Sequence, residues 1–136
     1  GARGVILLED DNKAFWHFAF NMAKQNSLSG KLIAEKYIPS YEFSVDALVY
    51  NREIFFMGIA DRIIALKPFF VELGHTMPSI RKKDYVDKVK HIMEKIKNAL
   101  SMEWGALKGD IFISKKDKRA YVGEVASRLS GGFMSG

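Results

Sequence analysis

One strongly amphipathic segment, residues 85–100, constrains the fold more than any other part of the sequence. Its apolar residues recur at steps of three and four, at Tyr85, Val89, Ile92, Ile96 and Leu100. Lysines occupy the other side, at Lys88, Lys90, Lys95 and Lys97. This period is typical of a helix that buries one face and exposes the other to solvent. We therefore expect a helix here that packs on the rest of the fold.

Most of the remaining sequence predicts strands. These are expected within residues 5–9, 32–38, 42–50, 54–64, 67–79, 108–114 and 119–126. Asn51-Arg52 and the sequence KKDK are expected to form hairpin turns. A second helix is expected over Lys13–Lys24, which Asp10, Asp11 or Asn12 can cap. Because the connections are short and antiparallel, this order of elements predicts an α+β domain.

Composition narrows the class of protein. A chain of 136 residues falls in the size range of one domain. It contains no cysteine, which excludes disulfides and thiolate metal sites and is typical of a reducing compartment. No run approaches the ~18 apolar residues of a membrane helix, so we expect a cytoplasmic protein without membrane contact. The net charge of +5 comes mostly from lysines on one helix and one turn, which favours a solvated face over nucleic-acid binding.

Two acidic residues stand inside the apolar strands of the last hairpin. Asp110 lies in GDIFI and Glu124 in YVGEVA. A carboxylate in an apolar strand is unfavourable unless it is paired or binds a metal ion, and Mg²⁺ prefers one or two carboxylates together with phosphate. A strand face exposed to solvent is the alternative interpretation. Arg128 follows Glu124 by four residues, where a guanidinium group can hold a phosphate or carboxylate.

Three further features suggest ligand binding, each with a plainer alternative. GARGV (Gly1–Val5) places glycines and an arginine where backbone N–H groups can approach a phosphate, although an ordinary turn has the same composition. Glu35 and Glu42 flank a proline turn and can accept hydrogen bonds from a ligand, or can be two solvated strand ends. His75 lies in a loop between glycine and proline, which alone is unremarkable.

Taken in order, these segments resemble the ATP-grasp superfamily. SGKLIAEKYIPSYEFSVDALV resembles its central hairpin, and GARGV resembles its glycine-rich lid. GEVASRLSGG is similar to the strand that carries its metal ligand, with Asp110 where the partner carboxylate is expected. PFFVELGHTMPS narrows the resemblance to carboxylate–amine ligases, the branch that includes L-amino-acid ligases and carbamoyl-phosphate-synthase-like proteins. The similarity covers essentially the whole chain.

The resemblance implies a partial ATP-grasp domain. Residues 1–64 would form the lid and adenine-binding subdomain, and residues 65–136 the metal- and phosphate-binding subdomain. It implies that Ala2, Arg3 and Gly4 lie over the triphosphate. Glu35, Lys36, Tyr37 and Ile38 would line the adenine, with Glu35 or Lys36 near its amine. Glu42 would bind the ribose hydroxyls.

The resemblance also assigns roles near the reacting groups. Asp110 and Glu124 would hold Mg²⁺, or Mn²⁺, against the phosphates of ATP. Arg128 would steady the transferred phosphoryl group or an acyl-phosphate, and Gly131 and Gly132 would form the turn beside it. Glu72 and His75 would face the second substrate, with His75 and Arg128 acting in catalysis. The implied chemistry is activation of a small carboxylate by ATP to an acyl-phosphate, followed by attack of an amine.

Two departures from the family pattern leave alternatives open. Ala126 stands where the family usually has asparagine. The family's phosphate-binding lysines and its N-terminal substrate domain normally precede the glycine-rich lid, so we expect this chain to be a fragment. The alternatives are a carbamoyl-phosphate-synthase-like or carboxylase-like enzyme, and a non-catalytic nucleotide-binding module. Exposed strand edges of such a fragment could also pair two copies into a homodimer.

The isolated 136 residues are therefore expected not to turn over. They would lack the upstream lysines that the resemblance requires for phosphate binding. The measurement is ADP or phosphate release from the purified fragment in the presence of ATP, Mg²⁺ and an amino-acid panel. Ligase activity from the fragment alone would contradict this expectation.

Overall fold

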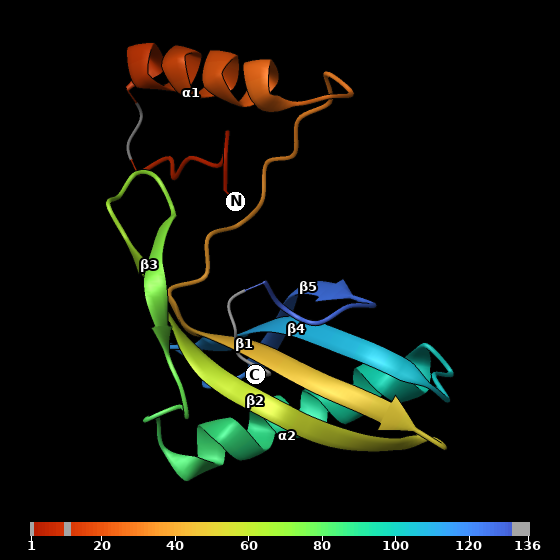
Figure 1. Cartoon of the computed structure of the whole chain (residues 1–136). Helices are drawn as coiled ribbons and strands as arrows, with labels where there is room; N and C mark the ends of the chain where they lie inside the picture. The colour runs from red at the N-terminus through yellow and green to blue at the C-terminus, as the bar shows by residue number, and fades with distance from the viewer. Residues whose placement is uncertain (1, 10–11, 132–136) are drawn as a thin grey trace. The chain divides into compact units, whose positions relative to one another are not determined.

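The computed structural model describes residues 2–9 and 12–131. Within them the elements follow the order α1 (Lys13–Asn26), β1 (Ser40–Tyr50), β2 (Glu53–Ala65), β3 (Val71–Thr76), α2 (Lys83–Ala99), β4 (Gly105–Ser114) and β5 (Ala120–Ala126). The strands form one sheet in the order β3-β2-β1-β4-β5 (Figure 1). β1 pairs antiparallel with both β2 and β4, and β4 pairs antiparallel with β5. The predicted α+β fold with an antiparallel sheet is confirmed.

The chain divides into two compact units by its internal contacts. The first comprises Gly1–Ile38 and Ile64–Gly74, and the second comprises Pro39–Ile63 and His75–Gly136. The second unit contains α2, β1, β4 and β5 and most of β2. The functional subdomains expected at 1–64 and 65–136 stay a prediction, because the two units are defined by packing alone.

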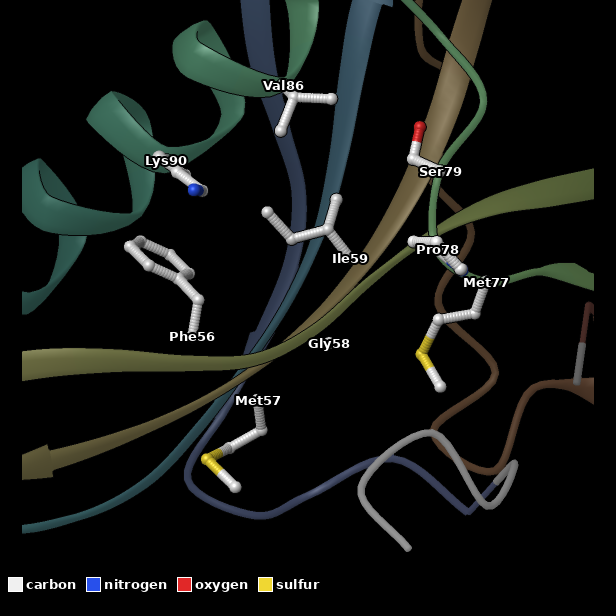
Figure 2. A pocket seen from close by; sticks show the side chains of 9 residues that line it. All are labelled: Phe56, Met57, Gly58, Ile59, Met77, Pro78, Ser79, Val86 and Lys90. Atoms are coloured by element: carbon white, nitrogen blue, oxygen red, sulfur yellow. The ribbon is translucent and has the colours of Figure 1, made fainter. Parts of the chain in front are cut away.

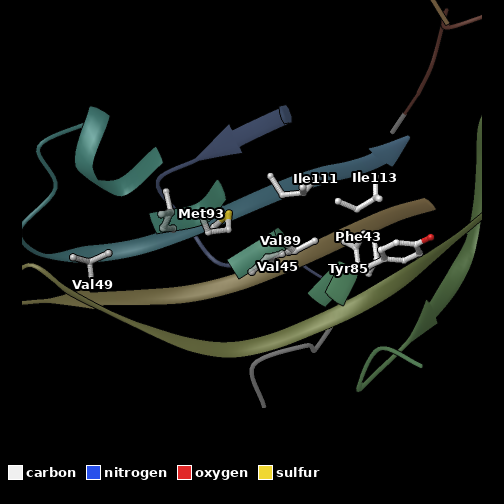
Figure 3. Packing of buried hydrophobic residues seen from close by; sticks show 9 residues of the cluster. Phe43, Val45, Val49, Tyr85, Val89, Met93, Ile111 and Ile113 are labelled. Carbon is white, nitrogen blue, oxygen red and sulfur yellow. The ribbon is translucent and has the colours of Figure 1, made fainter. Parts of the chain in front are cut away.

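The core of the second unit lies between α2 and one face of the sheet (Figures 1 and 3). Successive side chains of a strand point to opposite faces, so alternate apolar residues of β1 and β4 reach the helix. The sheet contributes Phe43, Val45, Val49, Leu107, Ile111 and Ile113, and the helix contributes Tyr85, Val89 and Met93. Each of these side chains is at most 9% exposed, and full burial of one such side chain contributes roughly 1.5–3 kcal/mol. The predicted amphipathic helix is thus confirmed, with its apolar face on the sheet, but Leu100, expected on that face, follows the helix and is 58% exposed.

Local residues account for the turns of the sheet. Asn51 and Arg52 both have positive φ angles, of 50° and 68°, as a two-residue hairpin turn requires. In the β4–β5 turn, the Ser114 hydroxyl accepts hydrogen bonds from the backbone N–H groups of Lys116 and Asp117. Hydrogen bonding to Ser114 lowers the pKa of Asp117 below its usual value. Both predicted hairpins are confirmed.

The first unit begins its helix as expected. The side chain of Asn12 accepts hydrogen bonds from the N–H groups of Ala14 and Phe15, at 3.0 and 3.3 Å, and so caps α1. The other two candidate caps, Asp10 and Asp11, lie outside the described residues. The helix ends at Asn26, two residues later than predicted.

Two predicted strands are wrong. Residues 5–9 make a single bridge, between Ile6 and Phe69, and one nearby hydrogen bond from Leu7 N to Pro68 O. Residues 32–38 belong to no strand, and the side chain of Ile33 is 84% exposed. Strand propensity reflects how well a side chain fits a half-buried sheet surface. Apolar residues that have no neighbouring strand to pair with therefore do not form a strand.

Neither helix in the described part of the chain is long and apolar enough to cross a membrane.

Met93 of α2 packs against Gly109 of β4, and this contact yields a stability prediction. A Cβ at this position would overlap the sulfur of Met93 and lie 3.1 Å from its Cε. Because Met93 is fully buried, Gly109→Ala should lower the free energy of unfolding by roughly 1–3 kcal/mol through overpacking. Urea denaturation measures this loss.

The matched control is Gly74→Ala, since a Cβ at Gly74 in β3 meets no atom within 4 Å. We expect it to change stability by less than about 1 kcal/mol. Equal effects of the two substitutions would contradict the close-approach argument.

Candidate functional site

The face of the sheet opposite α2 is polar. On β1, Glu42, Ser44 and Asp46 alternate with the core residues and therefore lie on this face. The register places Ser44 opposite Asp110 of β4, and Asp46 opposite Lys108. Directly opposed residues share a face, and the last four side chains named are all buried. Buried charge of both signs is thus concentrated on one surface of the sheet.

A β-bulge brings Glu124 to this face. Ile111 pairs with Val122 of β5, but Asp110 pairs with Glu124, so Gly123 is an extra residue in the strand. Simple alternation would put Glu124 on the same face as Val122, against α2. A one-residue shift reverses the face of every following side chain, and here it places Glu124 directly opposite Asp110.

Glycine is required at the bulge because an aromatic ring lies against it. A Cβ at Gly123 would lie 2.8 Å from Cε2 of Phe112 and 3.1 Å from the carbonyl oxygen of Asp110. Any larger residue would displace either the ring or the strand. The sequence YVGEVA therefore carries the signal for the bulge in its glycine.

Two cations neutralise Asp110. Its Oδ2 lies 2.8 Å from Nζ of Lys108 and 3.4 Å from a guanidinium nitrogen of Arg62 in β2. The same nitrogen of Arg62 lies 3.4 Å from Oε2 of Glu42, so one arginine joins two of the predicted ligand-binding carboxylates. The other oxygen of Asp110, Oδ1, is buried and has no hydrogen-bond partner. A buried carboxylate oxygen without a partner is unfavourable and is often a binding position.

Glu124 and Arg128 form the exposed end of the cluster. Their side chains are 60% and 57% exposed, and their charged groups lie 4.0 Å apart. Arg128 also donates a hydrogen bond to the carbonyl of Leu129 at 3.0 Å. Such an exposed pair contributes little to stability, so both groups are available to a ligand.

These residues fit a divalent cation that is shared with phosphate oxygens. No group of three or more histidine, cysteine, aspartate or glutamate side chains able to hold a metal occurs in the described range 2–9 and 12–131. Two opposed carboxylates, one with a buried unpartnered oxygen, suit Mg²⁺ bound through carboxylates and substrate phosphates instead. Arg62 and Arg128 supply positive charge for those phosphates.

The predicted lid residues lie in the first unit. Ala2 accepts a hydrogen bond from Val5 N–H at 3.1 Å, which closes a turn. Gly4 has a φ of +77°, and a Cβ there would lie 2.9 Å from Cβ of Asn26. The glycine is thus explained by its conformation and its contact with α1, and the triphosphate role of Ala2, Arg3 and Gly4 stays a prediction.

Tyr37 belongs to the predicted adenine segment, Glu35 to Ile38, whose role stays a prediction. Its ring centroid lies 5.8 Å from that of Phe70, and Nζ of Lys67 lies 5.5 Å from its centroid. Lys67 also binds Glu9 at 2.9 Å, and this carboxylate raises the pKa of Lys67. Glu35 and Lys36 are exposed. An aromatic ring held on two sides in this way can stack against a planar ligand.

The remaining predicted site residues are Glu72, His75, Gly131 and Gly132. Glu72 and His75 lie in β3, an edge strand of the sheet, so the expectation of a loop at His75 is wrong. In the order of strands, β2 and β1 stand between β3 and β4. Gly131 has open space where a Cβ would stand, and Gly132 lies outside the described residues. The second-substrate role of Glu72 and His75 stays a prediction.

Sequence reasoning missed four polar residues of this face: Arg62, Lys108, Asp46 and Ser130. Two of them follow from alternation. Lys108 precedes Asp110 by two positions, and Asp46 follows Glu42 by four, so each shares a face with a predicted site residue. Arg62 and Ser130 depend on tertiary pairing, for which the sequence has no local signal.

A separate hollow lies on the α2 side of β2 (Figure 2). It has a volume of about 380 Å³, and its wall is mainly apolar. It is lined by Phe56, Met57, Gly58, Ile59, Met77, Pro78, Ser79, Val86 and Lys90. None of these is a predicted site residue, so the hollow and the charged cluster are different places in the second unit.

Comparison with known sequences gives one match. The sequence profile of the ATP-grasp domain matches residues 9–135. No protein of curated function is similar enough in sequence to count as a match.

Comparison with solved structures gives many matches. L-amino acid ligase from Bacillus licheniformis is 22% identical, with a TM-score of 0.74 over 93% of this chain and 33% of its own. Biotin carboxylase from Campylobacter jejuni, solved as a β,γ-ATP complex, is 21% identical, with a TM-score of 0.72 over 96% of this chain and 30% of its own. Phosphoribosylglycinamide synthetase from Anaerococcus prevotii is 25% identical, with a TM-score of 0.60 over 92% of this chain and 33% of its own. The chain thus spans about a third of each of these proteins.

The ion pair between Lys108 and Asp110 yields a prediction about stability. Both side chains are about nine-tenths buried, so Lys108→Met should leave Asp110 with Arg62 as its remaining counter-charge. We expect a loss of roughly 2–3 kcal/mol in the free energy of unfolding. Adding Asp110→Asn to Lys108→Met should recover much of it, because the uncompensated charge is removed. Urea denaturation of the four proteins in this double-mutant cycle measures the coupling.

The control is Lys116→Met, at an exposed position in the β4–β5 turn, which should change stability by less than about 0.5 kcal/mol. Additive effects of the substitutions at 108 and 110 would contradict a stabilising pair.

Proposed function

Since this chain belongs to the ATP-grasp family, we propose that it is the ATP-binding core of a cytoplasmic ligase that joins a small carboxylate to an amine. The observation that carries the proposal is the direct opposition of Asp110 and Glu124 across β4 and β5. One of these carboxylates keeps a buried oxygen without a partner, and cations of Arg62 and Arg128 lie next to the pair. The carboxylates can bind a divalent cation, and the arginines can bind the triphosphate.

In this proposal Asp110 and Glu124 hold Mg²⁺, which when bound neutralises the phosphates of ATP. Arg128 steadies the γ-phosphoryl group, and its exposed guanidinium is free to move toward it. Glu42 binds the ribose hydroxyls. Arg62 holds Glu42 and Asp110 in place when no nucleotide is bound. The protein itself supplies positioning and charge, which is the main requirement of phosphoryl transfer.

The proposed reaction has two steps. An oxygen of the carboxylate substrate attacks the γ-phosphorus, the bond to the β,γ-bridging oxygen breaks, and ADP leaves. The amine then attacks the carbonyl carbon of the acyl-phosphate, inorganic phosphate leaves, and the nitrogen loses a proton. In this proposal the guanidinium of Arg128, 4.0 Å from Glu124, stabilises negative charge in both steps.

Ala126 favours a second candidate, a nucleotide-binding module without turnover. It pairs with Lys108 across β5 and β4 and brings no metal-binding atom to the polar face. The two candidates differ in one measurable property of the full-length protein. The ligase turns over ATP in the presence of its substrates, whereas the module binds ATP without Mg²⁺-dependent turnover.

The test is ADP release by the full-length protein with ATP, Mg²⁺ and a panel of amino acids offered singly and in pairs. The ligase predicts release that depends on a carboxylate and an amine together. ATP binding measured by calorimetry, with no release under any combination, would instead support the module. Absence of both binding and release would overturn each candidate.

Two substitutions locate the activity at the proposed site. Asp110→Asn and Glu124→Gln should each lower kcat by about 100-fold or more, because each removes a charge that holds the cation. Both changes preserve side-chain volume. Raising the Mg²⁺ concentration should recover part of the activity.

Glu94→Gln, at an exposed position of α2, is the matched control and should keep wild-type kcat. Unchanged activity in Glu124→Gln would rule out this residue as a ligand.

A further inference from the structure

A buried carboxylate outside the Asp110–Glu124 pair ties two distant parts of the second unit together. Asp46 is 0% exposed, and both of its oxygens accept hydrogen bonds from Ser130. The backbone N–H of Ser130 donates to Oδ1 at 2.9 Å, and its hydroxyl donates to Oδ2 at 2.7 Å. The two residues are 84 positions apart in sequence. None of the roles proposed above uses this carboxylate.

These two hydrogen bonds stabilise the buried carboxylate of Asp46, which burial without partners would disfavour. A carboxylate removed from water is unfavourable unless it is hydrogen-bonded. Bonds to an ionised acceptor are shorter and stronger than bonds between neutral groups. Asp46 therefore holds Ser130 more firmly than a neutral residue at this position would.

The register shows where the chain runs between these residues. Ala126, Lys108 and Asp46 form one row across β5, β4 and β1, because Ala126 pairs with Lys108 and Lys108 pairs with Asp46. β5 ends at Ala126, at one end of this row, and Ser130 binds Asp46 at the other end. Residues 128–130, the crossing segment, therefore pass over β4 on its polar face. Such a cover agrees with the low exposure of Lys108, 8%.

The neighbouring strand leaves room for this contact. Gly58 of β2 lies directly opposite Asp46 and contributes no side chain to the polar face. On the other side, Lys108 is directed to Asp110 at 2.8 Å. Neither neighbouring strand thus blocks the contact of Ser130 with Asp46 on the polar face.

The crossing segment carries Arg128, the proposed phosphoryl clamp. Its backbone is fixed on one side by Ala126 in β5 and on the other by Ser130 on Asp46. The guanidinium itself stays exposed, 4.0 Å from Glu124. This arrangement fixes the base of a long side chain and leaves its charged end able to reach a ligand.

We infer that Asp46 is a positioning residue: through Ser130 it holds the crossing segment on the sheet and so sets the place of Arg128 beside the Asp110–Glu124 pair. The inference rests on the proposed function for its catalytic consequence, but the holding of the segment is independent of any activity. Asp46 itself contacts no reacting group in this role.

The first test measures the segment directly in the full-length protein. Hydrogen–deuterium exchange of peptides covering residues 127–131 should speed up in Asp46→Asn and, to a smaller extent, in Ser130→Ala. Ser130→Ala keeps the backbone bond at 2.9 Å and loses the hydroxyl bond. Ser130→Thr keeps a hydroxyl and should restore wild-type exchange. Ser127→Ala, the same chemical change at an exposed position just after β5, should match wild type.

The second test measures the consequence for the reaction. Ser130→Ala should lower kcat by about 10-fold and Asp46→Asn by up to about 100-fold, because a misplaced catalytic group loses its alignment. The affinity for ATP, measured by calorimetry without the other substrates, should stay within about 2-fold of wild type. Ser130→Thr should recover most of kcat.

The outcomes separate this inference from the proposed function. Wild-type exchange in Ser130→Ala and Asp46→Asn overturns the inference, whatever the activity. A fall in kcat that only follows the unfolded fraction, with no recovery in Ser130→Thr, also overturns it. If Asp46→Asn does not fold, Ser130→Ala and Ser130→Thr still decide the question. If the wild-type protein has no ligase activity, the proposed function fails, and exchange alone decides whether Asp46 holds the segment.

Discussion

The second unit depends on the neutralisation of charges that are buried on one face of its sheet. The opposite face carries the apolar residues that pack on α2. Asp110 is neutralised by Lys108 and Arg62, and Asp46 accepts two hydrogen bonds from Ser130. These contacts join β1, β2, β4 and the chain after β5. Because an isolated buried charge is strongly unfavourable, changing one member disturbs all of these segments.

Local patterns in the sequence predicted much of this fold. The period of α2 and the two hairpins depend on residues close together in the chain, and all three are present. The strand expected at 32–38 is absent because its formation needs a partner strand, which no local pattern specifies. The correct and the wrong expectations therefore differ in the range of the interaction: helix periodicity and hairpins between adjacent strands are specified locally, whereas pairing with a distant strand is not.

The candidate site shows the same limit in finer detail. The unusual position of Asp110 and Glu124 among apolar residues marked them correctly as residues of neighbouring strands. Alternation alone, however, would assign Glu124 to the face of Val122, and the bulge at Gly123 reverses this assignment. Arg62 reaches the pair from β2, across β1, so its role as counter-charge depends on the order of strands in the sheet. Gly123 is a local sign of this bulge, but Gly109 precedes Asp110 in the same way without a bulge in β4, so the pattern alone does not specify one.

The charges on the polar face bear on how the metal ion and the nucleotide would bind. Under the proposed function, Mg²⁺ would bind the unpartnered Oδ1 of Asp110, while Lys108 and Arg62 stay 2.8 and 3.4 Å from Oδ2. A divalent cation bound there alone would lie close to two largely buried positive groups, and like charges close together are unfavourable. The phosphates of a nucleotide that binds with the cation would supply the negative charge that offsets it. The proposed function therefore favours joint binding of the metal and the nucleotide over binding of the metal alone.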